Sequence, residues 1–498
     1  MKNKFLRFLM LLACIIFLSA NLSFSAYHHM DEQDSDKFLQ IYPDKANTKL
    51  DSCALCHSGG SYEKYPDSGQ FIKMGSCQWC HYKYGYDASG NIVETLNSYG
   101  KDFFLNGRNS NAVKNIEALD SDSDGFSNLE EINALRHPGD ALDDPEKIVA
   151  PYRVYSKDEL TQLPQHTQFM LMNTNRSGDY YAEYSGVPLE TLLMDAGILE
   201  TATGITVYAP DGWSTYHPLD PVEEPSLYHV KGVYPQATYY YEPEAELWCD
   251  YSAPICSAFS NASIIPVTGG LKALVALQIN GANLTQGILN NENRLDGSGP
   301  YRIIVPQKTP GAPDQSSKSE NQNVVWPFNH DWDHNAGYCT RSVTIIKVEP
   351  LPEGTTDINV MEAGWNFIDQ EKIIIYGAIK GQTGSLSGQV LTLINNEKMG
   401  LSNATITIVE TGHKATTQPD GSYTIENVPV GTYFVSIKHG GKNLLSFDHI
   451  TIEEDKNTNI PICTLPLQKN PCDIDNNNAI GLKEIIHWLN ELAAGLTN

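Results

Sequence analysis

The feature that most constrains this chain is a pair of Cys-x-x-Cys-His motifs, which begin at Cys53 and Cys77. Two thiols three residues apart can form thioether bonds with the two vinyl groups of one haem, and the adjacent histidine can then bind the iron. The sequence therefore predicts two covalently bound haem c groups. The predicted attachment residues are Cys53, Cys56, His57, Cys77, Cys80 and His81.

Two other kinds of site use a similar spacing. Four thiolates in this arrangement also suit a tetrahedral zinc ion, and one Cys-x-x-Cys pair can act as a redox dithiol. Neither alternative requires a histidine directly after both pairs. An export signal at the N-terminus also favours haem, since haem c is attached on the export route.

Residues 1–26 have the pattern of a signal peptide. A basic start is followed by an apolar run from Phe8 to Ala20 and then by small residues up to Ala26. An alternative is a lipoprotein signal at Cys14, although the apolar run continues past that residue. We expect an exported protein in the periplasm, on the outer surface or outside the cell. No later stretch is apolar for long enough to span a membrane.

The formal net charge of −26 argues against nucleic acid and anionic lipid as binding partners. Nucleic acid and anionic lipid both require clustered positive charge. Part of the acidity lies in two segments with the pattern of calcium loops, so bound ions would neutralise some of it.

Each haem iron can take a sixth ligand, and histidine would keep the potential lower than methionine would. We prefer His137, because a helix is expected to end there against the domain. The full set of candidates is His28, His29 and His137, with Met30 and Met74 as alternatives and with His330 and His334 from the next domain.

Residues 120–131 match the calcium-binding EF-hand loop position for position. Oxygen ligands are expected at loop positions 1, 3, 5, 7, 9 and 12, from Asp120, Asp122, Asp124, the Phe126 carbonyl, Asn128 and Glu131. Gly125 makes the turn. Apolar residues recur at helical spacing before and after the loop, so we expect a helix on each side. The alternative is a solvated acidic turn.

The segment from the first haem motif through Ser98-Tyr99-Gly100 to the loop and Pro138-Gly139-Asp140 resembles the EF-hand-bearing cytochrome c domains of metal-reducing and sulfate-reducing bacteria. Members usually carry one haem motif, so residues 77–81 resemble an insertion that adds a second. The resemblance implies electron transfer, with calcium holding the helices that pack on the haems.

The middle of the chain has short β-rich runs separated by turn residues. The segments Gly186-Val187-Pro188-Leu189, Asp211-Gly212, Ile279-Asn280-Gly281 and Pro300–Pro306 occur in an order that resembles the molybdopterin-binding fold of the sulfite oxidase family. Those enzymes bind molybdenum through a cysteine upstream of the first segment, and residues 165–184 contain none. We therefore expect a scaffold without molybdenum.

The C-terminal part has two further modules. Alternating strands and turns with Asp420-Gly421 and Pro429 resemble the carboxypeptidase regulatory-like β-sandwich. A second, weaker calcium loop follows, with Asp473, Asp475, Asn477, the Ala479 carbonyl and Glu484 as its ligands. The helix after it resembles half of a dockerin-type module, and its apolar stripe can either pack on the β-sandwich or dock a protein partner.

The remaining cysteines suggest disulfide bonds in an oxidising compartment. Cys249 and Cys256 are close neighbours in sequence, as are Cys463 and Cys472, and Cys339 is left over. Sequence alone does not establish either pairing.

We expect a multidomain chain with a small α-helical diheme module, mainly-β domains and a short helical calcium-loop tail. The predicted regions are a signal peptide (1–26), a diheme domain (27–148), a molybdopterin-fold-like domain (149–352), a connecting segment (353–384), a β-sandwich (385–468) and a dockerin-like tail (469–498). The leading interpretation is an electron carrier that exchanges electrons with redox proteins or an extracellular acceptor. The alternatives are a haem-relayed oxidoreductase, with its active site in the middle domain, and an adhesive scaffold with redox-sensing haems.

Overall fold

A computed structural model gives the fold of the chain in two compact units, residues 1–381 and 382–498. The structure describes residues 33–57, 61–63, 71–73, 90–174, 178–210, 213–222, 227–240, 254–289, 295–314, 333–360, 368, 370–394 and 397–465. None of the helices in these ranges is long and apolar enough to cross a membrane.

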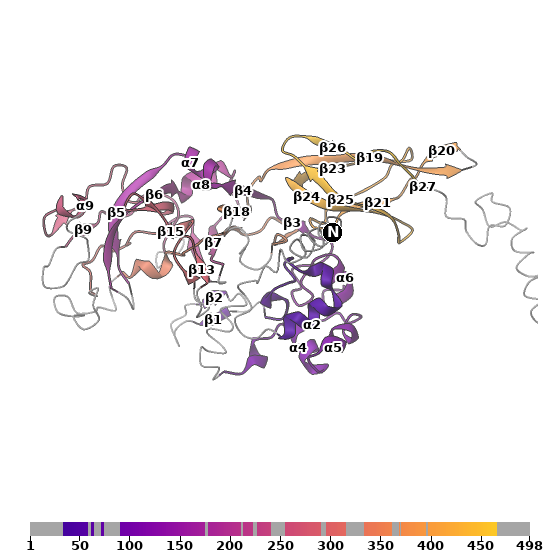
Figure 1. The fold of residues 1–498 in the computed structure, drawn as a ribbon, viewed down its shortest axis with the longest axis horizontal. Coiled ribbons are helices and arrows are strands. Elements are labelled where there is room, and N and C mark those ends of the chain that lie inside the picture. Colours follow the sequence, from indigo (N-terminus) through magenta and orange to yellow (C-terminus); the bar gives the residue numbers. More distant parts are fainter. Residues whose placement is uncertain are drawn as a thin grey trace, which may run out of the picture. The chain divides into compact units, whose positions relative to one another are not determined.

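Short helices gather in one module at the start of the first unit (Figure 1). They are α2 (Gln33–Ile41), η1 (Pro43–Lys45), η2 (Cys53–Leu55), η4 (Ile92–Thr95), α4 (Ser98–Leu105), α5 (Ser110–Asn115) and α6 (Asn128–Asn133). Helices this short are marginal alone, so their ends need capping. Side chains of Asn97 and Asn109 cap α4 and α5, and Ser127 with Glu130 forms a capping box on α6.

The helical module has a small apolar core. Its buried members are Phe38, Leu50, Leu55, Tyr99, Phe103, Ala112, Val113, Ile116, Ile132 and Leu135. Helices α5 and α6 lie before and after the acidic loop, as the periodicity predicts, whereas Leu119 points outward and is 42% exposed. A short hairpin, β1 (Ser61–Glu63) with β2 (Phe71–Lys73), lies between the two haem motifs in sequence.

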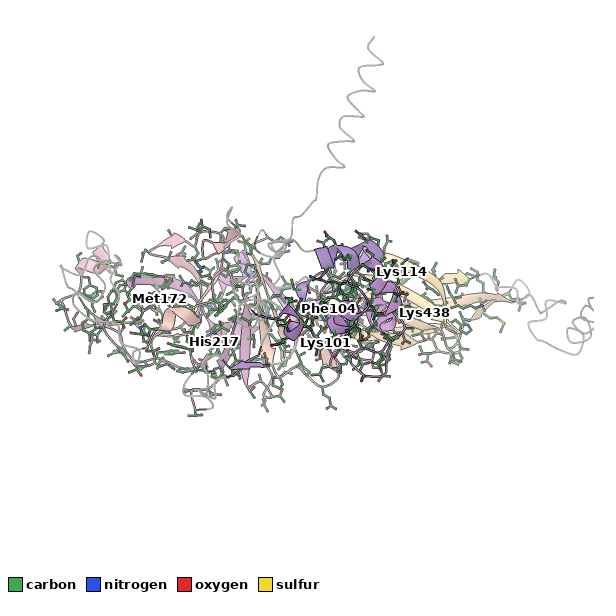
Figure 2. The ribbon with its side chains drawn as sticks, turned by 90° about the horizontal axis from the view of Figure 1, so that it is seen from below. Lys101, Phe104, Lys114, Met172, His217 and Lys438 are labelled. Atoms are coloured by element: carbon green, nitrogen blue, oxygen red, sulfur yellow. The ribbon has the colours of Figure 1, made fainter. Side chains whose placement is uncertain are left out.

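Two five-stranded sheets enclose the core of the middle domain. One has the order β12-β11-β6-β5, with β15 also paired to β11; its strands are β5 (His166–Met172), β6 (Tyr180–Pro188), β11 (Leu274–Ile279), β12 (Ala282–Asn283) and β15 (Arg302–Ile304). Met172 of this sheet and His217 of the second sheet, both labelled in Figure 2, are fully buried within the middle domain. Asn280 and Gly281 have positive φ and make the tight turn between β11 and β12.

The second sheet has the order β4-β18-β16-β7-β8. Its strands are β4 (Tyr152–Ser156), β7 (Gly204–Tyr208), β8 (Ser214–Pro218), β16 (Ile345–Glu349) and β18 (Lys372–Gly377). The short elements around the two sheets are α7 (Lys157–Gln162), α8 (Leu189–Asp195), β9 (Thr238–Tyr239), α9 (Pro254–Ser257), β10 (Ser263–Ile264), β13 (Ile288–Leu289), β14 (Leu295–Asp296) and η7 (Asn335–Tyr338).

The predicted boundary at residue 352 is wrong. Residues 353–384 are not merely a connection, because β18 lies between β4 and β16 in the second sheet. Its Ile373, Ile374 and Ile375 are buried. Strand β17 (Thr355–Thr356) also pairs in parallel with β3 (Ile148–Val149), at the end of the helical module. The apolar run Ile373–Ile375 is therefore part of a buried strand of the middle domain.

The second unit is a β-sandwich. One sheet is built on β19 (Thr383–Ile394), which pairs with β20 (Glu397–Gly400), β23 (Ser422–Pro429), β26 (Asn457–Asn459) and β27 (Cys463–Leu465). The other has the order β22-β21-β24-β25, with β21 (Thr405–Ile408), β22 (Lys414–Thr416), β24 (Gly431–His439) and β25 (Lys442–Ile452). Alternate apolar residues of β21, β23 and β24 form its core. The described chain is thus a mainly-β multidomain protein with few helices and a C-terminal β-sandwich.

Candidate functional site

The first haem motif folds into one tight turn. Helix η2 covers Cys53–Leu55, and the amides of Cys56 and His57 both donate to the Cys53 carbonyl, at 3.1 and 2.9 Å. The turn therefore brings Cys53, Cys56 and His57 together, as the motif predicts. Cys77, Cys80 and His81 of the second motif lie outside the described residues, as do His28 and His29.

The N-terminus of helix α4 is hydrogen-bonded to this turn. The Asn97 amide nitrogen donates to the Cys56 carbonyl at 2.8 Å, and its side-chain Nδ2 donates to the Leu55 carbonyl at 3.0 Å. The Asn97 Oδ1 accepts from the Gly100 amide at 2.8 Å and so caps α4. Sequence analysis did not identify Asn97. Its signal is an N-cap residue directly before Ser98-Tyr99-Gly100.

The ring of His57 is fixed by Thr95. The Nδ1 of His57 lies 2.7 Å from the Thr95 hydroxyl and 3.3 Å from the Thr95 carbonyl oxygen. No hydrogen-bond partner for His57 Nε2 is found among the described residues. Thr95 is only 1% exposed and was also missed by sequence analysis, because no motif includes it.

Burial controls the chemistry of the ionisable groups in this turn. Burial raises the pKa of the Cys56 thiol to about 12, and the nearby Asp34 carboxylate adds to the shift. A thiol with so high a pKa is a poor redox nucleophile, unlike the cysteines of dithiol enzymes. Burial also lowers the pKa of His57, which keeps the imidazole neutral. The Tyr99 hydroxyl is buried nearby with no hydrogen-bond partner among the described residues.

These residues fit covalent haem attachment. Cys53, Cys56 and His57 share one turn, and the imidazole is neutral with Nε2 available to bind iron. The module's small core and short helices also suit a domain that is completed by a prosthetic group.

The partners of His137 within the module argue against our preference for it as a distal haem ligand. Its Nδ1 lies 3.0 Å from Asp143 Oδ2, and its Nε2 lies 3.2 Å from the Lys49 carbonyl oxygen. Both ring nitrogens are therefore occupied within the module. The turn after α6 thus places the ring in a buried polar cluster with Lys49 and Asp143.

That buried polar cluster joins the helical module to the middle domain. Lys49 Nζ forms an ion pair with Asp143 at 2.6 Å, and Arg136 lies 3.7 Å from the same carboxylate. The Thr356 hydroxyl of β17 donates to Asp143 at 2.5 Å, and the Lys49 amide donates to Asn359 at 3.0 Å. Burial is the largest single influence and opposes ionisation of Asp143. The charges of Lys49 and Arg136 and the hydrogen bond and charge of His137 together outweigh burial and lower the pKa of Asp143.

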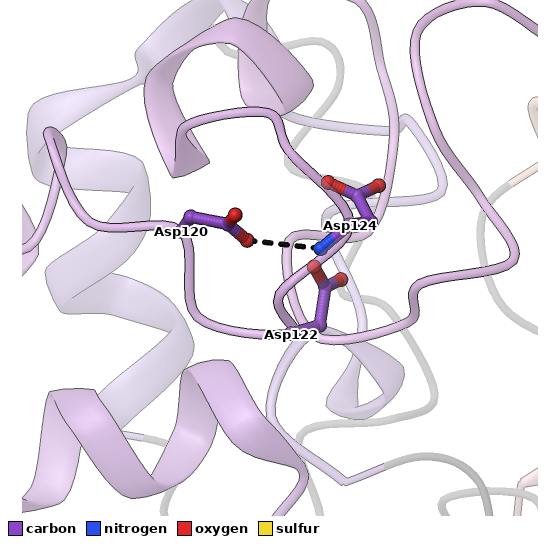
Figure 3. A group of neighbouring side chains, drawn as sticks. All are labelled: Asp120, Asp122 and Asp124. Carbon is purple, nitrogen blue, oxygen red and sulfur yellow. Dashed lines mark hydrogen bonds between the residues drawn. The ribbon is translucent and has the colours of Figure 1, made fainter.

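The acidic loop after α5 has the geometry of a cation site (Figure 3). One carboxylate oxygen from each of Asp120, Asp122 and Asp124 lies within 4.8 Å of the others. Backbone amides of Ser123 and Gly125 donate to Asp120, at 2.7 and 3.0 Å, and hold the loop closed. Gly125 has φ +103°, a conformation that side chains rarely adopt, so the predicted turn glycine is where the loop needs it.

Glu131 is the loop residue whose environment best fits a bound cation. It is fully buried, and neither of its carboxylate oxygens has a hydrogen-bond partner among the described residues. Both oxygens of Asp122 and one of Asp124 are likewise buried without a partner. Burial, with repulsion from Asp122 and Asp124, raises the pKa of Glu131 to about 9. Buried carboxylates with free lone pairs fit a hard cation such as Ca²⁺.

Asn128 has a different role from the one predicted. Its Nδ2 donates to the Ile116 carbonyl at 2.7 Å and contacts the Ser121 hydroxyl at 2.9 Å. Its Oδ1 accepts from the Ser121 amide at 3.3 Å, so both ends of this fully buried side chain brace α5 against α6 instead of facing the loop as a direct ligand. Ser121 in turn donates to Asp102 of α4 at 2.7 Å, which links the loop to the helix that packs on the Cys53–His57 turn.

The candidate haem ligand His334 and the cysteines Cys256 and Cys339 are buried within the middle domain. His334 is buried with its Nε2 3.2 Å from Asp314, so the expectation that it reaches a haem is wrong; His330 lies outside the described residues. Cys339 is a buried free thiol that accepts from the Val305 amide at 3.4 Å. Cys256 is disulfide-bonded, and its predicted partner Cys249 lies outside the described residues.

The C-terminal sites are only partly described. Cys463 is a free thiol that contacts the Pro461 carbonyl oxygen at 3.3 Å, so the suggested bond to Cys472 is not formed here. Cys463 lies on the short strand β27 at the end of the described chain. The second calcium loop, Asp473 to Glu484, lies outside the described residues together with Cys472.

Comparison with known proteins identifies one part of the chain. A search of the curated proteins with the whole chain found no match. Similar solved structures include two interface mutants of a type II cohesin–X–dockerin complex from Acetivibrio cellulolyticus. One is a C-terminal interface mutant, with 18% identity, TM-score 0.14 and coverage of 16% of this chain and 56% of that chain. The other is an N-terminal interface mutant, with 21% identity, TM-score 0.15 and coverage of 21% and 70%.

A third solved structure is the sulfane dehydrogenase SoxCD from Paracoccus pantotrophus, with 10% identity, TM-score 0.21 and coverage of 60% of this chain and 67% of that chain. At TM-scores this low, these likenesses carry no weight for fold or function. Residues 385–465, by contrast, match the family model of the carboxypeptidase regulatory-like domain, and in the structure they form the β-sandwich. This part of the chain is a carboxypeptidase regulatory-like domain.

Proposed function

We propose that this protein is an exported diheme c-type cytochrome that carries electrons rather than catalysing a reaction. One observation supports this above the others. Cys53, Cys56 and His57 share a single turn, and the His57 ring is hydrogen-bonded through Nδ1 so that Nε2 remains available for iron. The second haem would be held by Cys77, Cys80 and His81.

A bound haem supplies an iron that cycles between the ferric and ferrous states by gaining and losing one electron. The electron would come from a reduced carrier protein and pass to an oxidised redox protein or a ferric mineral. The chain's own part is to hold the motif. Asn97 fixes the turn from behind, Gly100 allows α4 to approach it, and Thr95 orients His57.

We also propose that Asp120, Asp122, Asp124, the Phe126 carbonyl and Glu131 bind one Ca²⁺ ion. The buried, unpartnered oxygens of Glu131 support this directly. The ion would neutralise the repulsion between these carboxylates, and the contact between Ser121 and Asp102 would transmit that stabilisation to α4. A second, weaker site is proposed at Asp473, Asp475, Asn477, Ala479 and Glu484.

The remaining domains would display the haem module in the periplasm or at the cell surface. The middle domain has a sequence resemblance to the molybdopterin-binding fold without the metal-binding cysteine, so we propose a scaffold that binds no molybdenum. The buried cluster of Lys49, Asp143 and Thr356 would hold the helical module against this scaffold. A protein partner at the C-terminal helix is also proposed.

Redox cycling of the purified full chain tests the electron-carrier proposal. The chain is produced in a host that attaches haem c, reduced with dithionite and mixed with ferric citrate. The proposal predicts sharp ferrous absorption bands that disappear on mixing and return with fresh reductant. A chain with Cys53 and Cys56 both replaced by alanine should lose about half of the signal. A protein with no such bands, or with haem that does not re-oxidise, would overturn the proposal.

A further inference from the structure

We propose that Thr95 is a positioning residue for the first haem: its hydroxyl fixes the tautomer and orientation of His57 and increases electron donation from that ring to the iron. This inference rests on the proposed function. It concerns a residue that belongs to no recognised motif and lies 38 positions beyond His57 in the chain.

The hydrogen bonds around Thr95 determine which nitrogen of His57 carries the proton. The Thr95 hydroxyl donates its proton to the Ile92 carbonyl, at 2.6 Å. The same oxygen can therefore only accept from His57 Nδ1, which lies 2.7 Å away. His57 Nδ1 must then carry a hydrogen, and the lone pair of the neutral ring lies on Nε2. This is the tautomer that binds iron through Nε2.

The local fold gives Thr95 little freedom to do anything else. Thr95 ends helix η4 and is almost fully buried, and the Asn91 side chain caps the start of this helix. Two residues later, Asn97 is hydrogen-bonded to the Cys56 carbonyl. One short segment thus contacts the histidine on one side and the cysteine turn on the other, so the ring and the thiols are held together.

The contact also has an electronic consequence. A metal-bound histidine that donates its second ring hydrogen becomes a more basic ligand, and such partners tune the metal they do not touch. The Thr95 hydroxyl accepts while donating to Ile92, so the two hydrogen bonds polarise one another. A stronger donor ligand favours ferric over ferrous iron. Removing the hydroxyl should therefore shift the midpoint potential to a more positive value.

The test compares Thr95→Val with Thr95→Ser in the full chain. Valine keeps the size and branching but removes the hydroxyl, whereas serine keeps the hydroxyl. Both are made in a background with Cys77 and Cys80 replaced by alanine, so that only the first haem is measured. The readouts are the midpoint potential by spectroelectrochemistry, the iron–histidine stretching band by resonance Raman spectroscopy, and haem content.

We expect Thr95→Val to shift the potential positively and the stretching band to lower frequency, with Thr95→Ser close to the parent. Loss of haem from the valine variant alone would also support a positioning role. Unchanged potential and band in a haem-loaded Thr95→Val variant would overturn the inference, as would equal losses in both variants. A parent chain that binds no haem would instead overturn the proposed function.

Discussion

Gly100 of α4 packs directly against the backbone of Cys56, so closely that a Cβ at Gly100 would lie 2.4 Å from the Cys56 carbonyl oxygen. The contact joins a helix to a turn more than forty residues earlier in the chain. It leaves no room for a side chain, because the opposing atom is backbone and not the end of a flexible side chain. Helix α4 can therefore approach the Cys53–His57 turn this closely only with glycine at position 100.

Replacing Gly100 with alanine should disrupt this contact. The Cβ would push α4 away from the turn, and overpacking of this kind costs about 1–3 kcal/mol. We expect Gly100→Ala to lower haem content and to lower the temperature at which the Soret band of the loaded chain is lost. Lys101→Ala, on the exposed side of the same helix, is the control and should leave both unchanged. Normal haem content and thermal stability in Gly100→Ala would show that this close approach does not matter.

Glu131→Gln should abolish calcium binding in the first loop. The change removes the negative charge whose oxygens are buried without a partner. We expect at least a tenfold loss of Ca²⁺ affinity by isothermal titration, from the loss of one charged ligand of the loop. Glu130→Gln is the matched control, since Glu130 is exposed and caps α6 through Ser127 rather than facing the loop.

Calcium should also stabilise the folded module by mass action. A ligand at one hundred times its dissociation constant contributes about 2.7 kcal/mol. Adding a chelator should lower the thermal midpoint of the parent chain and of Glu130→Gln, but not that of Glu131→Gln. Equal effects of the chelator on all three proteins would place the stabilising ion elsewhere.

Asp143 should make the stability of the helical module depend on acid pH. Burial raises the pKa of Asp143, but Lys49, His137 and Arg136 together hold it below its ordinary value, so the stabilising contribution of the Asp143 carboxylate is present at neutral pH. That contribution is lost as the pH falls below the ordinary carboxyl value of about 3.9 toward the lower folded value.

In the Asp143→Asn variant, the free energy of unfolding of the helical module should therefore depend less on pH below about 4, and it should be lower than in the parent at pH 7. Breaking a buried ion pair by removing one partner typically costs about 3–5 kcal/mol, because Lys49 is left buried without it. Urea unfolding followed by the Soret band from pH 2 to 7 measures both effects. Asp44→Asn, at an exposed carboxylate, is the control. An acid limb that keeps its slope in Asp143→Asn would contradict this account.

Two turn glycines in the β-sandwich should respond differently to alanine. Both Gly421 and Gly440 have positive φ, but a Cβ on Gly421 would meet the Val390 carbonyl at 2.0 Å, whereas Gly440 has open space. We expect Gly440→Ala to cost about 1 kcal/mol from backbone conformation alone, and Gly421→Ala to cost distinctly more. Amide hydrogen exchange in β19 and β23 of the full chain would show the difference. Similar protection in both variants would contradict it.

Parts of this structure could be predicted because chemistry fixes the spacing of residues. The haem turn and the acidic loop need particular residues at set positions in one short segment, and the structure brings those residues together at 53–57 and 120–131. The alternation of strand and turn residues, with the Asp420-Gly421 turn, likewise predicts the β-sandwich that the family match identifies.

The rest depends on contacts between distant segments, which sequence spacing does not reveal. Thr95 and Asn97 act through packing on a turn far earlier in the chain. His137 lies four residues beyond the end of α6, where the Asp143 carboxylate and the Lys49 carbonyl occupy both of its ring nitrogens. The run at residues 372–377 fits a strand, yet only the tertiary fold shows that it belongs to the sheet of the preceding domain.

The central claim is that Cys53–His57 and Cys77–His81 each hold a covalent haem. A pyridine haemochrome assay combined with the intact mass of the purified full chain tests it most directly. The account predicts two haems per chain, and proteolytic peptides containing residues 53–57 and 77–81 that each carry the mass of one haem. A chain with no haem and with zinc bound to these cysteines would contradict it.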